Sequence, residues 1–195
     1  MVFLMEILKF NDYVSEGNSS GRIVLYHGTK AKFKSFDASY LNSGWGEQAY
    51  GYGFYLTDNY EAANEYSRGG YVIKVSVPEK KYLSYFGISR NEKVSIAKKF
   101  FKYYTEVDEY GKEAYPTQEL KNEFWNGECK YLVDCEDGGD IYGTIASLIG
   151  SDKETSEFLK SIGYVGIKFQ GDNGGTGEKF TNYVIFDPKD IEVLD

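Results

Sequence analysis

Short apolar segments separated by glycine-rich turns are the feature that most restricts the fold. Four of these segments have the β-branched and aromatic composition of strands, and they lie at residues 22–27, 71–77, 165–169 and 183–186. They do not alternate regularly with helices, as the strands of a doubly wound parallel sheet do. We therefore predict an α+β fold whose strands are mostly antiparallel.

The composition agrees with a folded chain that does not bind polyanions through its overall charge. Hydrophobic residues make up 42% of the 195 residues, which is enough for a core and excludes intrinsic disorder. The net charge of −8 argues against non-specific binding to nucleic acid or to anionic lipid. It does not exclude an enzyme that acts on nucleic acid through a local pocket.

Helix starts are indicated by Ser or Asp followed three residues later by Glu. Such pairs occur at Asp58 and Glu61, Ser89 and Glu92, and Ser151 and Glu154. Between the second and third helices, residues 106–140 are polar and acidic and are predicted to be an insertion on the surface. Residues 170–181 are glycine-rich and are also predicted to be a loop.

We expect two parts along the chain. Residues 1–20 form a helical leader, and residues 21–195 form a single domain with an insertion at about 84–150. The leader has an apolar helical stripe interrupted by charges, unlike a signal peptide, and no run reaches the roughly 20 apolar residues of a membrane helix. Packing on the domain and docking to another molecule are both open for it. We expect a cytoplasmic protein with no membrane partner.

Metal chemistry has little support in the sequence. One histidine and two cysteines, Cys129 and Cys135, exclude a histidine-built zinc site and a disulfide framework, so we interpret the cysteines as reduced thiols. An acidic cluster fits either a solvated loop or an oxygen-ligand Ca²⁺ site, but its spacing matches no EF-hand. The cluster comprises Asp134, Glu136, Asp137 and Asp140. We expect no metal.

Two motifs contain the residues suited to chemistry. The first is His27-Gly28-Thr29 at the end of a strand, where imidazole offers a directed hydrogen bond and glycine permits close approach to the backbone. The second is residues 51–58 (GYGFYLTD), in which Tyr55 is followed eleven residues later by Tyr66. Two tyrosines can enclose a flat ring. A surface histidine and a turn with core aromatics are the alternatives.

Together these motifs resemble the ADP-ribosyltransferase superfamily. The order His27-Gly28-Thr29, then residues 51–58, then Tyr66, then Asn182-Tyr183 is similar to its His-Tyr-Glu branch, which includes poly(ADP-ribose) polymerases and diphtheria-like toxins. The similarity covers about residues 22–78 and 160–195. It implies a core of two packed, mostly antiparallel sheets with flanking helices.

The resemblance also implies roles in binding NAD as a substrate. His27 would bond the adenosine-side ribose, Gly28 would offer backbone groups to the nicotinamide amide, and Thr29 completes that motif. Tyr55 and Tyr66 would stack on the two faces of the nicotinamide. Residues 170–181 would occupy the place of a target-recognition loop.

The chain departs from this pattern at the catalytic glutamate, because Asn182 stands there. An amide can bond a ribose hydroxyl but carries no charge. Three outcomes are open: Asn182 suffices for a single transfer, Glu178 reaches in from the preceding loop, or NAD is bound without efficient catalysis. Ala63, where the polymerases place a serine, further weakens the polymerase analogy.

The sequence thus predicts an NAD-dependent mono-ADP-ribosyltransferase that releases nicotinamide and modifies a protein or a nucleic acid. The alternatives are a non-catalytic module that binds NAD or ADP-ribose, and an NAD glycohydrolase. The short leader and the single domain suggest a toxin or effector, of bacterial or bacteriophage origin, that acts inside a bacterial cell.

Overall fold

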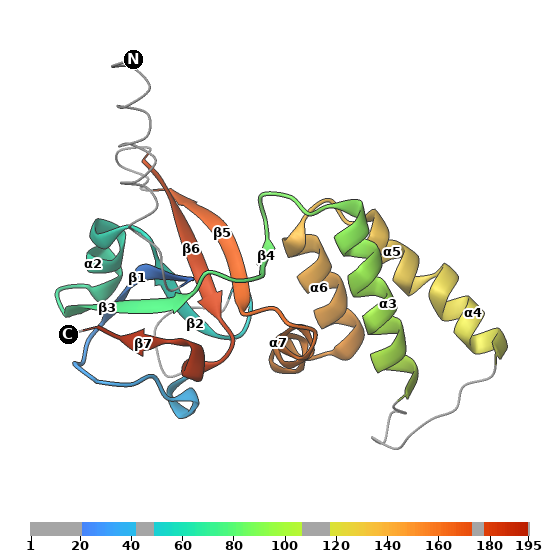
Figure 1. Ribbon diagram of the computed structural model, residues 1–195, viewed down its shortest axis with the longest axis horizontal. Helices are drawn as coiled ribbons and strands as arrows, with labels where there is room; N and C mark the ends of the chain where they lie inside the picture. Colours follow the sequence, from blue (N-terminus) through green and yellow to red (C-terminus); the bar gives the residue numbers. More distant parts are fainter. Residues whose placement is uncertain (1–20, 42–48, 107–117, 173–177, 195) are drawn as a thin grey trace, which may run out of the picture.

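The structure is a computed structural model, and it describes residues 21–41, 49–106, 118–172 and 178–194. The predicted leader helix lies outside these residues. The described strands form one sheet in the order β4-β5-β6-β2-β1-β3-β7 (Figure 1). Their bounds are β1 Arg22–Thr29, β2 Phe54–Thr57, β3 Tyr71–Pro78, β4 Tyr82–Ser84, β5 Gly166–Asp172, β6 Lys179–Ile185 and β7 Glu192–Val193.

The prediction of an α+β fold with mostly antiparallel strands agrees with this sheet, in which β4 and β5 form the parallel pair. The prediction of two separate sheets is not confirmed. Strand β2 joins the two halves, because it pairs with β6 along its whole length and with β1 at Tyr26↔Thr57. Each half retains its own hydrophobic cluster, one around Leu25 and Val75 and the other around Leu83 and Ile167.

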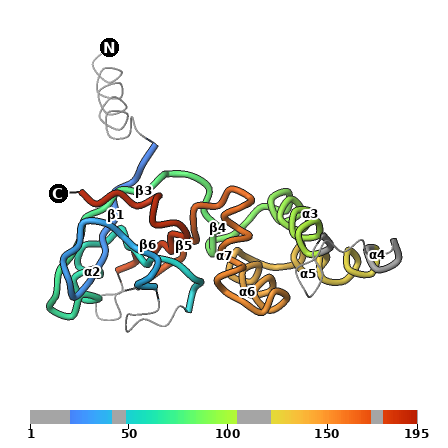
Figure 2. The backbone as a smooth tube through the Cα atoms, turned by 90° about the horizontal axis from the view of Figure 1, so that it is seen from below, coloured from blue at the N-terminus to red at the C-terminus, as the bar shows by residue number. Residues whose placement is uncertain are grey.

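In the part of the chain that the structure describes, one α-helix accompanies the first strands and five others follow β4. The helices are α2 Tyr60–Ser67, α3 Arg90–Glu106, α4 Gln118–Asn126, α5 Glu128–Asp134, α6 Gly138–Ile149 and α7 Asp152–Ser161, and two short 3₁₀ helices lie at Ala38–Tyr40 and Pro188–Asp190. Helices α3 to α7 form a helical lobe beside the sheet, and α2 lies against β1 and β3 (Figures 1 and 2).

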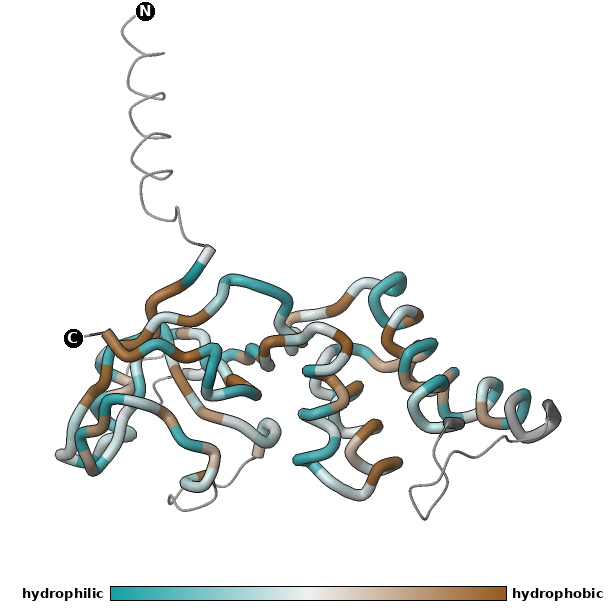
Figure 3. Tube along the Cα trace, turned by 60° about the horizontal axis from the view of Figure 1, so that its bottom comes forward, coloured by the Kyte–Doolittle hydropathy of each residue, from teal (hydrophilic) through white to brown (hydrophobic). Residues whose placement is uncertain are grey.

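The helical lobe shares a core with one half of the sheet. Hydrophobic and hydrophilic residues are interspersed along its helices, as expected for amphipathic segments (Figure 3). Phe100 of α3, Ile141 of α6 and Leu159 of α7 are fully buried together with Ile167 and Val184 of the sheet. The lobe is therefore packed against the strands through a common apolar interface.

Residues 106–140, predicted to be an insertion on the surface, are helical in their described part, where α4, α5 and the start of α6 are found. Charged residues on the outer faces of these helices make the segment polar in composition, although the helices also have a buried stripe that includes Cys129 and Leu132. The acidic cluster has a local role there. Asp137 accepts hydrogen bonds from the N–H groups of Gly139 and Asp140, and so caps α6.

Two of the three predicted helix starts are confirmed. Ser89 accepts from the Glu92 N–H, and Ser151 accepts from the Glu154 N–H. The third is wrong by one residue, because Asn59 caps α2 by accepting from the Ala62 N–H. The Asp58 carboxylate instead accepts a hydrogen bond from β6, a strand distant in the sequence, and only the tertiary structure shows this contact.

The predicted loop at 170–181 is largely strand in its described part. Strand β5 continues to Asp172 and β6 begins at Lys179, with the two paired throughout. Tertiary pairing overrides the weak strand propensity of glycine here, because β6 supplies hydrogen-bond partners for the β5 backbone. Residues 173–177 lie outside the described residues.

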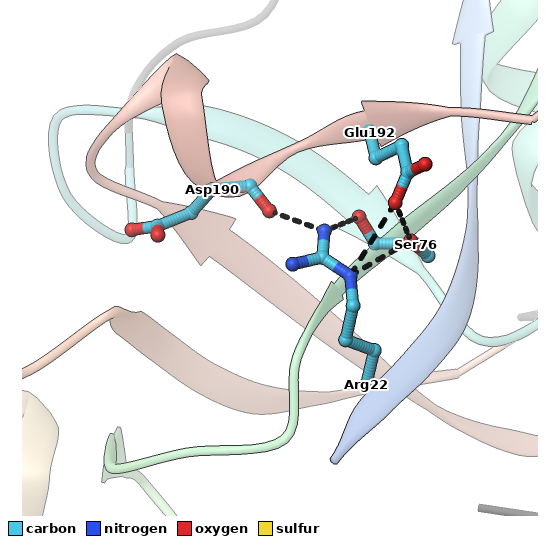
Figure 4. Close-up of polar contacts among 4 residues, drawn as sticks. All are labelled: Arg22, Ser76, Asp190 and Glu192. Carbon is cyan, nitrogen blue, oxygen red and sulfur yellow. Dashed lines mark hydrogen bonds and ion pairs between the residues drawn. The ribbon is translucent and has the colours of Figure 1, made fainter. Parts of the chain in front are cut away.

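Arg22 fastens the C-terminal strand to the sheet (Figure 4). Its Nε donates to Ser76 Oγ at 2.9 Å, and its Nη2 donates to the carbonyl oxygens of Ser76 and Asp190 at 2.7 and 2.9 Å. Glu192 lies 3.7 Å from the same Nε and accepts from Ser76 Oγ. The guanidinium thus links β1, β3 and β7, and ties the C-terminal strand to the first strand of the sheet.

The remaining structural findings concern the two cysteines and the question of membrane-spanning helices. Cys129 and Cys135 are free thiols, the first buried and the second half-buried. Burial raises the pKa of the Cys129 thiol to about 12, which keeps it protonated and unreactive. Among the described residues, no helix has the length and apolar character needed to span a membrane.

Candidate functional site

Strands β2 and β6 place two of the predicted site residues on one face of the sheet. Tyr55 pairs with Val184, and Thr57 pairs with Asn182. Directly opposed residues of antiparallel strands point to the same face, so Tyr55 and Asn182 are diagonal neighbours there. Such neighbours lie about 7–8 Å apart. An aromatic ring and a carboxamide from segments far apart in the sequence are thereby brought together.

The Tyr55 side chain is held by the turn that precedes its strand. Its hydroxyl donates to the Gly51 carbonyl oxygen at 3.0 Å and accepts from the Tyr50 N–H at 3.1 Å. Burial raises the pKa of Tyr55 to about 12, so the phenol stays neutral near pH 7. The ring is therefore a fixed apolar surface with its polar end satisfied, and it is suited to stacking rather than to acid–base chemistry.

His27 bridges β1 and β2 where their backbone pairing ends. Tyr26 of β1 pairs with Thr57 of β2. The next residue of β1, His27, donates from its imidazole Nδ1–H to the Tyr55 carbonyl oxygen at 2.9 Å. A carbonyl oxygen can only accept, so this bond assigns the proton to Nδ1 and leaves Nε2 as an acceptor. The ring also contacts Phe33 and Phe36.

His27 is expected to stay neutral at physiological pH. Burial lowers its pKa from 6.5 and outweighs the bond to the Tyr55 carbonyl, which raises it. The unfolded chain binds the His27 proton more tightly than the folded chain does. The contribution of neutral His27 to the free energy of unfolding should therefore be fully present above pH 6.5 and should decrease as the pH falls below it. His27 is the only histidine, so its single imidazole NMR signal should titrate below 6.5. A midpoint at or above 6.5 would contradict this prediction.

Gly28 is required by the close approach of α2. A Cβ atom there would lie 2.0 Å from the Ala63 carbonyl oxygen and 2.7 Å from the Ser67 nitrogen, both backbone atoms of α2. Ala63 and Ser67 are themselves completely buried. The His-Gly-Thr sequence therefore sets how closely α2, which carries Tyr66, can lie against β1.

Replacing Gly28 with alanine should displace α2 and lower the free energy of unfolding by about 1–3 kcal/mol, as overpacking does. The matched control is Gly143→Ala in α6, where an added Cβ meets nothing within 4 Å. That change should stabilise the protein by about 0.5–1 kcal/mol, because alanine favours the helix. Chemical denaturation measures the free energy of unfolding of both variants. Equal free energies of unfolding would contradict the prediction.

Asn182 lies in the middle of the sheet, between Thr57 of β2 and Phe169 of β5, and is 7% exposed. A Cβ on Gly171 would come within 2.6 Å of its Nδ2, so that glycine leaves room for the carboxamide. No described residue hydrogen-bonds the carboxamide, and no described side-chain polar atom is both buried and unpartnered. Asn182 is thus almost completely buried, and its carboxamide atoms keep a small exposure to solvent.

Asp58 fixes the strand next to this amide. Its carboxylate accepts from the Thr181 N–H at 2.8 Å, and its own N–H donates to the Thr181 carbonyl oxygen at 3.0 Å. Glu178 is not brought to the site. It is exposed and precedes β6, four residues from Asn182, which is about 13 Å along an extended chain.

The remaining predicted residues lie on α2 and at the end of β1. Tyr66 is 60% exposed, and no ring contact joins it to Tyr55 in the described part of the chain. Two rings that enclose a third are separated by about 7 Å, twice the contact distance, so direct contact is not required. Thr29 ends β1 and accepts from the Ala31 N–H at 3.4 Å.

Residues that the sequence did not single out complete the surroundings of Tyr55. Tyr50 stacks on Phe169 with ring centroids 3.9 Å apart, and Phe169 contacts the Tyr55 ring edge-on. No local sequence signal identifies these partners, because strand register brings Phe169 beside the turn. The open hollows of the helical lobe, one of about 830 Å³ between α5 and α6, are lined by none of the predicted site residues.

Comparison with known proteins identifies a family for the chain. A family model described as ADP-ribosyltransferase in polyvalent proteins matches residues 18–194. No curated protein and no solved structure matches the chain. The match spans both the sheet that carries Tyr55 and Asn182 and the helical lobe beside it.

Proposed function

Because the chain belongs to the ADP-ribosyltransferase family of polyvalent proteins, we propose that it transfers one ADP-ribose group from NAD to a macromolecule and releases nicotinamide. The observation that supports this most strongly is the shared face of β2 and β6, where the Tyr55 ring and the Asn182 carboxamide are neighbours. Nicotinamide is a flat leaving group that needs a ring to stack on, and the ribose attached to it needs a polar group beside that ring.

The proposed reaction breaks the bond between C1′ of the ribose and the nicotinamide nitrogen. The electron pair leaves with nicotinamide, C1′ passes through an oxocarbenium-like state, and a nucleophile of the target attacks it and loses its proton. Tyr55 stacks on the leaving ring, with Tyr66 on the opposite face. Nε2 of His27 accepts from a ribose hydroxyl of the adenosine half, and Gly28 presents backbone groups to the nicotinamide amide.

Asn182 sets the limit of this chemistry. Its carboxamide can orient a hydroxyl of the nicotinamide-side ribose, but it carries no negative charge toward the cationic sugar. A single missing electrostatic contact costs about 10²–10³ in rate. We therefore assign the chain a single, slow transfer to a nucleophile that is already reactive, and not the extension of a polymer.

The acceptor is proposed to be a protein or a compact feature of a nucleic acid, such as one base or a terminal phosphate. With a net charge of −8, the chain is poorly suited to long contacts with a phosphate backbone. The free thiols of Cys129 and Cys135 fit a reducing compartment, and we propose the bacterial cytoplasm as the place of action.

Labelled NAD tests the proposal. The purified chain is incubated with bacterial lysate and NAD labelled in its adenosine half, and label is measured in the protein, nucleic-acid and small-molecule fractions. The expected result is label in one macromolecular fraction, dependent on the Tyr55 ring. Free ADP-ribose without labelled macromolecules would identify an NAD glycohydrolase instead.

A non-catalytic module that binds NAD or ADP-ribose is the second candidate, and the observation that favours it is Asn182 itself. In that case calorimetry would detect NAD binding, while nicotinamide would not be released in the presence of lysate. Turnover by the natural protein would exclude this candidate.

A further inference from the structure

We propose that Tyr142 of α6 and Ser156 of α7 are positioning residues for the Tyr55 ring, and that the helical lobe thereby forms part of the NAD site. The expected effect on NAD binding rests on the proposed function, but the positioning of the Tyr55 ring is tested without NAD. Both residues belong to the lobe, far from Tyr55 in the sequence.

The evidence begins with the backbone of Tyr52, in the turn before β2. The Tyr52 N–H donates to the Tyr142 hydroxyl at 3.0 Å, and the Tyr52 carbonyl oxygen accepts from Ser156 Oγ at 2.8 Å. Side chains of two helices thus satisfy both polar groups of one turn residue. In a sheet this task falls to a neighbouring strand.

The two hydroxyls are themselves held in place. Tyr142 and Ser156 are 4% and 2% exposed, and their oxygens are 3.0 Å apart. The single hydroxyl hydrogen of Tyr142 points to the Asp152 carbonyl oxygen at 2.9 Å or to Ser156 Oγ. Such buried, connected hydroxyls have defined positions, because few alternative partners are available to them.

The turn is packed closely against both the lobe and the sheet. A Cβ on Gly51 would lie 2.6 Å from Ile167 Cδ1 and 3.1 Å from the Tyr142 ring. A Cβ on Gly53 would lie 2.6 Å from the Ile185 carbonyl oxygen. Residues 51–53 therefore fit between α6 and the sheet only because two of them are glycines.

The last link reaches Tyr55. Its hydroxyl donates to the Gly51 carbonyl oxygen, one residue before the anchored Tyr52. The chain of contacts therefore runs from α6 and α7 to the Tyr52 backbone, then to Gly51, then to the Tyr55 hydroxyl. Loss of the Tyr142 hydroxyl would leave the Tyr52 N–H without its partner and release the turn that orients the Tyr55 ring.

The test uses 3-fluorotyrosine placed at position 55 of the full chain, observed by ¹⁹F NMR without ligand, together with NAD affinity measured by calorimetry. Tyr142→Phe and Ser156→Ala should each shift or broaden the fluorine signal. They should weaken NAD binding about tenfold, the usual scale for a buried polar group left unpaired.

Two matched controls lose buried hydroxyls elsewhere. Tyr164→Phe removes a hydroxyl that donates to Glu92, and Thr155→Val removes one that donates to the carbonyl oxygen of Ser151, which caps α7. Both controls should retain the natural fluorine signal and NAD affinity, whatever their effect on thermal stability. A general loosening of the fold would move all four variants together, which would overturn the inference.

The two proposals fail in different ways. If the natural chain does not bind NAD, the proposed function is wrong, while the fluorine signals still decide whether Tyr142 and Ser156 position Tyr55. If the signals of Tyr142→Phe and Ser156→Ala superimpose on the natural one, or shift without any loss of NAD affinity in a chain that binds NAD, the inference is overturned.

Discussion

Tyr55→Ala is expected to reduce NAD affinity and nicotinamide release about 100-fold, because burial of one aromatic ring against a ligand contributes about 2–3 kcal/mol. Tyr55→Phe should lose only about tenfold in affinity, the loss expected for Tyr142→Phe, because it breaks the same chain of contacts. It preserves the stacking surface and loses only the bonds of the hydroxyl to Gly51 and Tyr50. Calorimetry and a nicotinamide-release assay measure both variants.

Tyr82→Ala is the matched control for this prediction. Tyr82 is also half-buried, and its hydroxyl likewise donates to a backbone carbonyl, that of Pro78 at 2.8 Å. It lies on β4 at the far edge, separated from β2 by β5 and β6. Truncation there should destabilise the protein without a specific loss of NAD affinity. Equal losses of affinity in the two alanine variants would show that Tyr55 has no direct role.

Asn182→Glu is expected to accelerate nicotinamide release by about 10²–10³, because it adds a negative charge beside the developing sugar cation. Asn182→Gln is the control, since it has the same length as glutamate and no charge. The comparison is made at pH 8, where a carboxyl group with a pKa raised by partial burial is ionised. Single-turnover rates of nicotinamide release measure the difference.

Both outcomes of this comparison are informative about the site. A rise in the glutamate variant alone would place position 182 beside the reacting sugar. Equal rates for glutamate and glutamine would remove position 182 from the reaction and leave the shared face of β2 and β6 without its proposed chemistry. Folding of both variants is checked by thermal unfolding, because Asn182 is buried between β2 and β5.

Local patterns were sufficient for several elements. The alternation at 71–77 and the capping pairs at Ser89 and Ser151 correspond to β3, α3 and α7. They succeed because their cause is local: one face of a strand is buried, or one side chain bonds an N–H three residues away. The helices in the described part of residues 106–140 were not predicted, because their buried residues are spaced too sparsely to be recognised without their partners.

The sequence by itself determined which side chains are available for chemistry: one histidine, a glycine that allows close approach, tyrosines eleven residues apart, and an asparagine at position 182. Only the tertiary structure decided which of them meet. Register between β2 and β6 sets Tyr55 beside Asn182, and the extension of β6 keeps Glu178 away. The physical reason is that pairing partners and helix packing depend on contacts between segments more than a hundred residues apart, which no local spacing encodes.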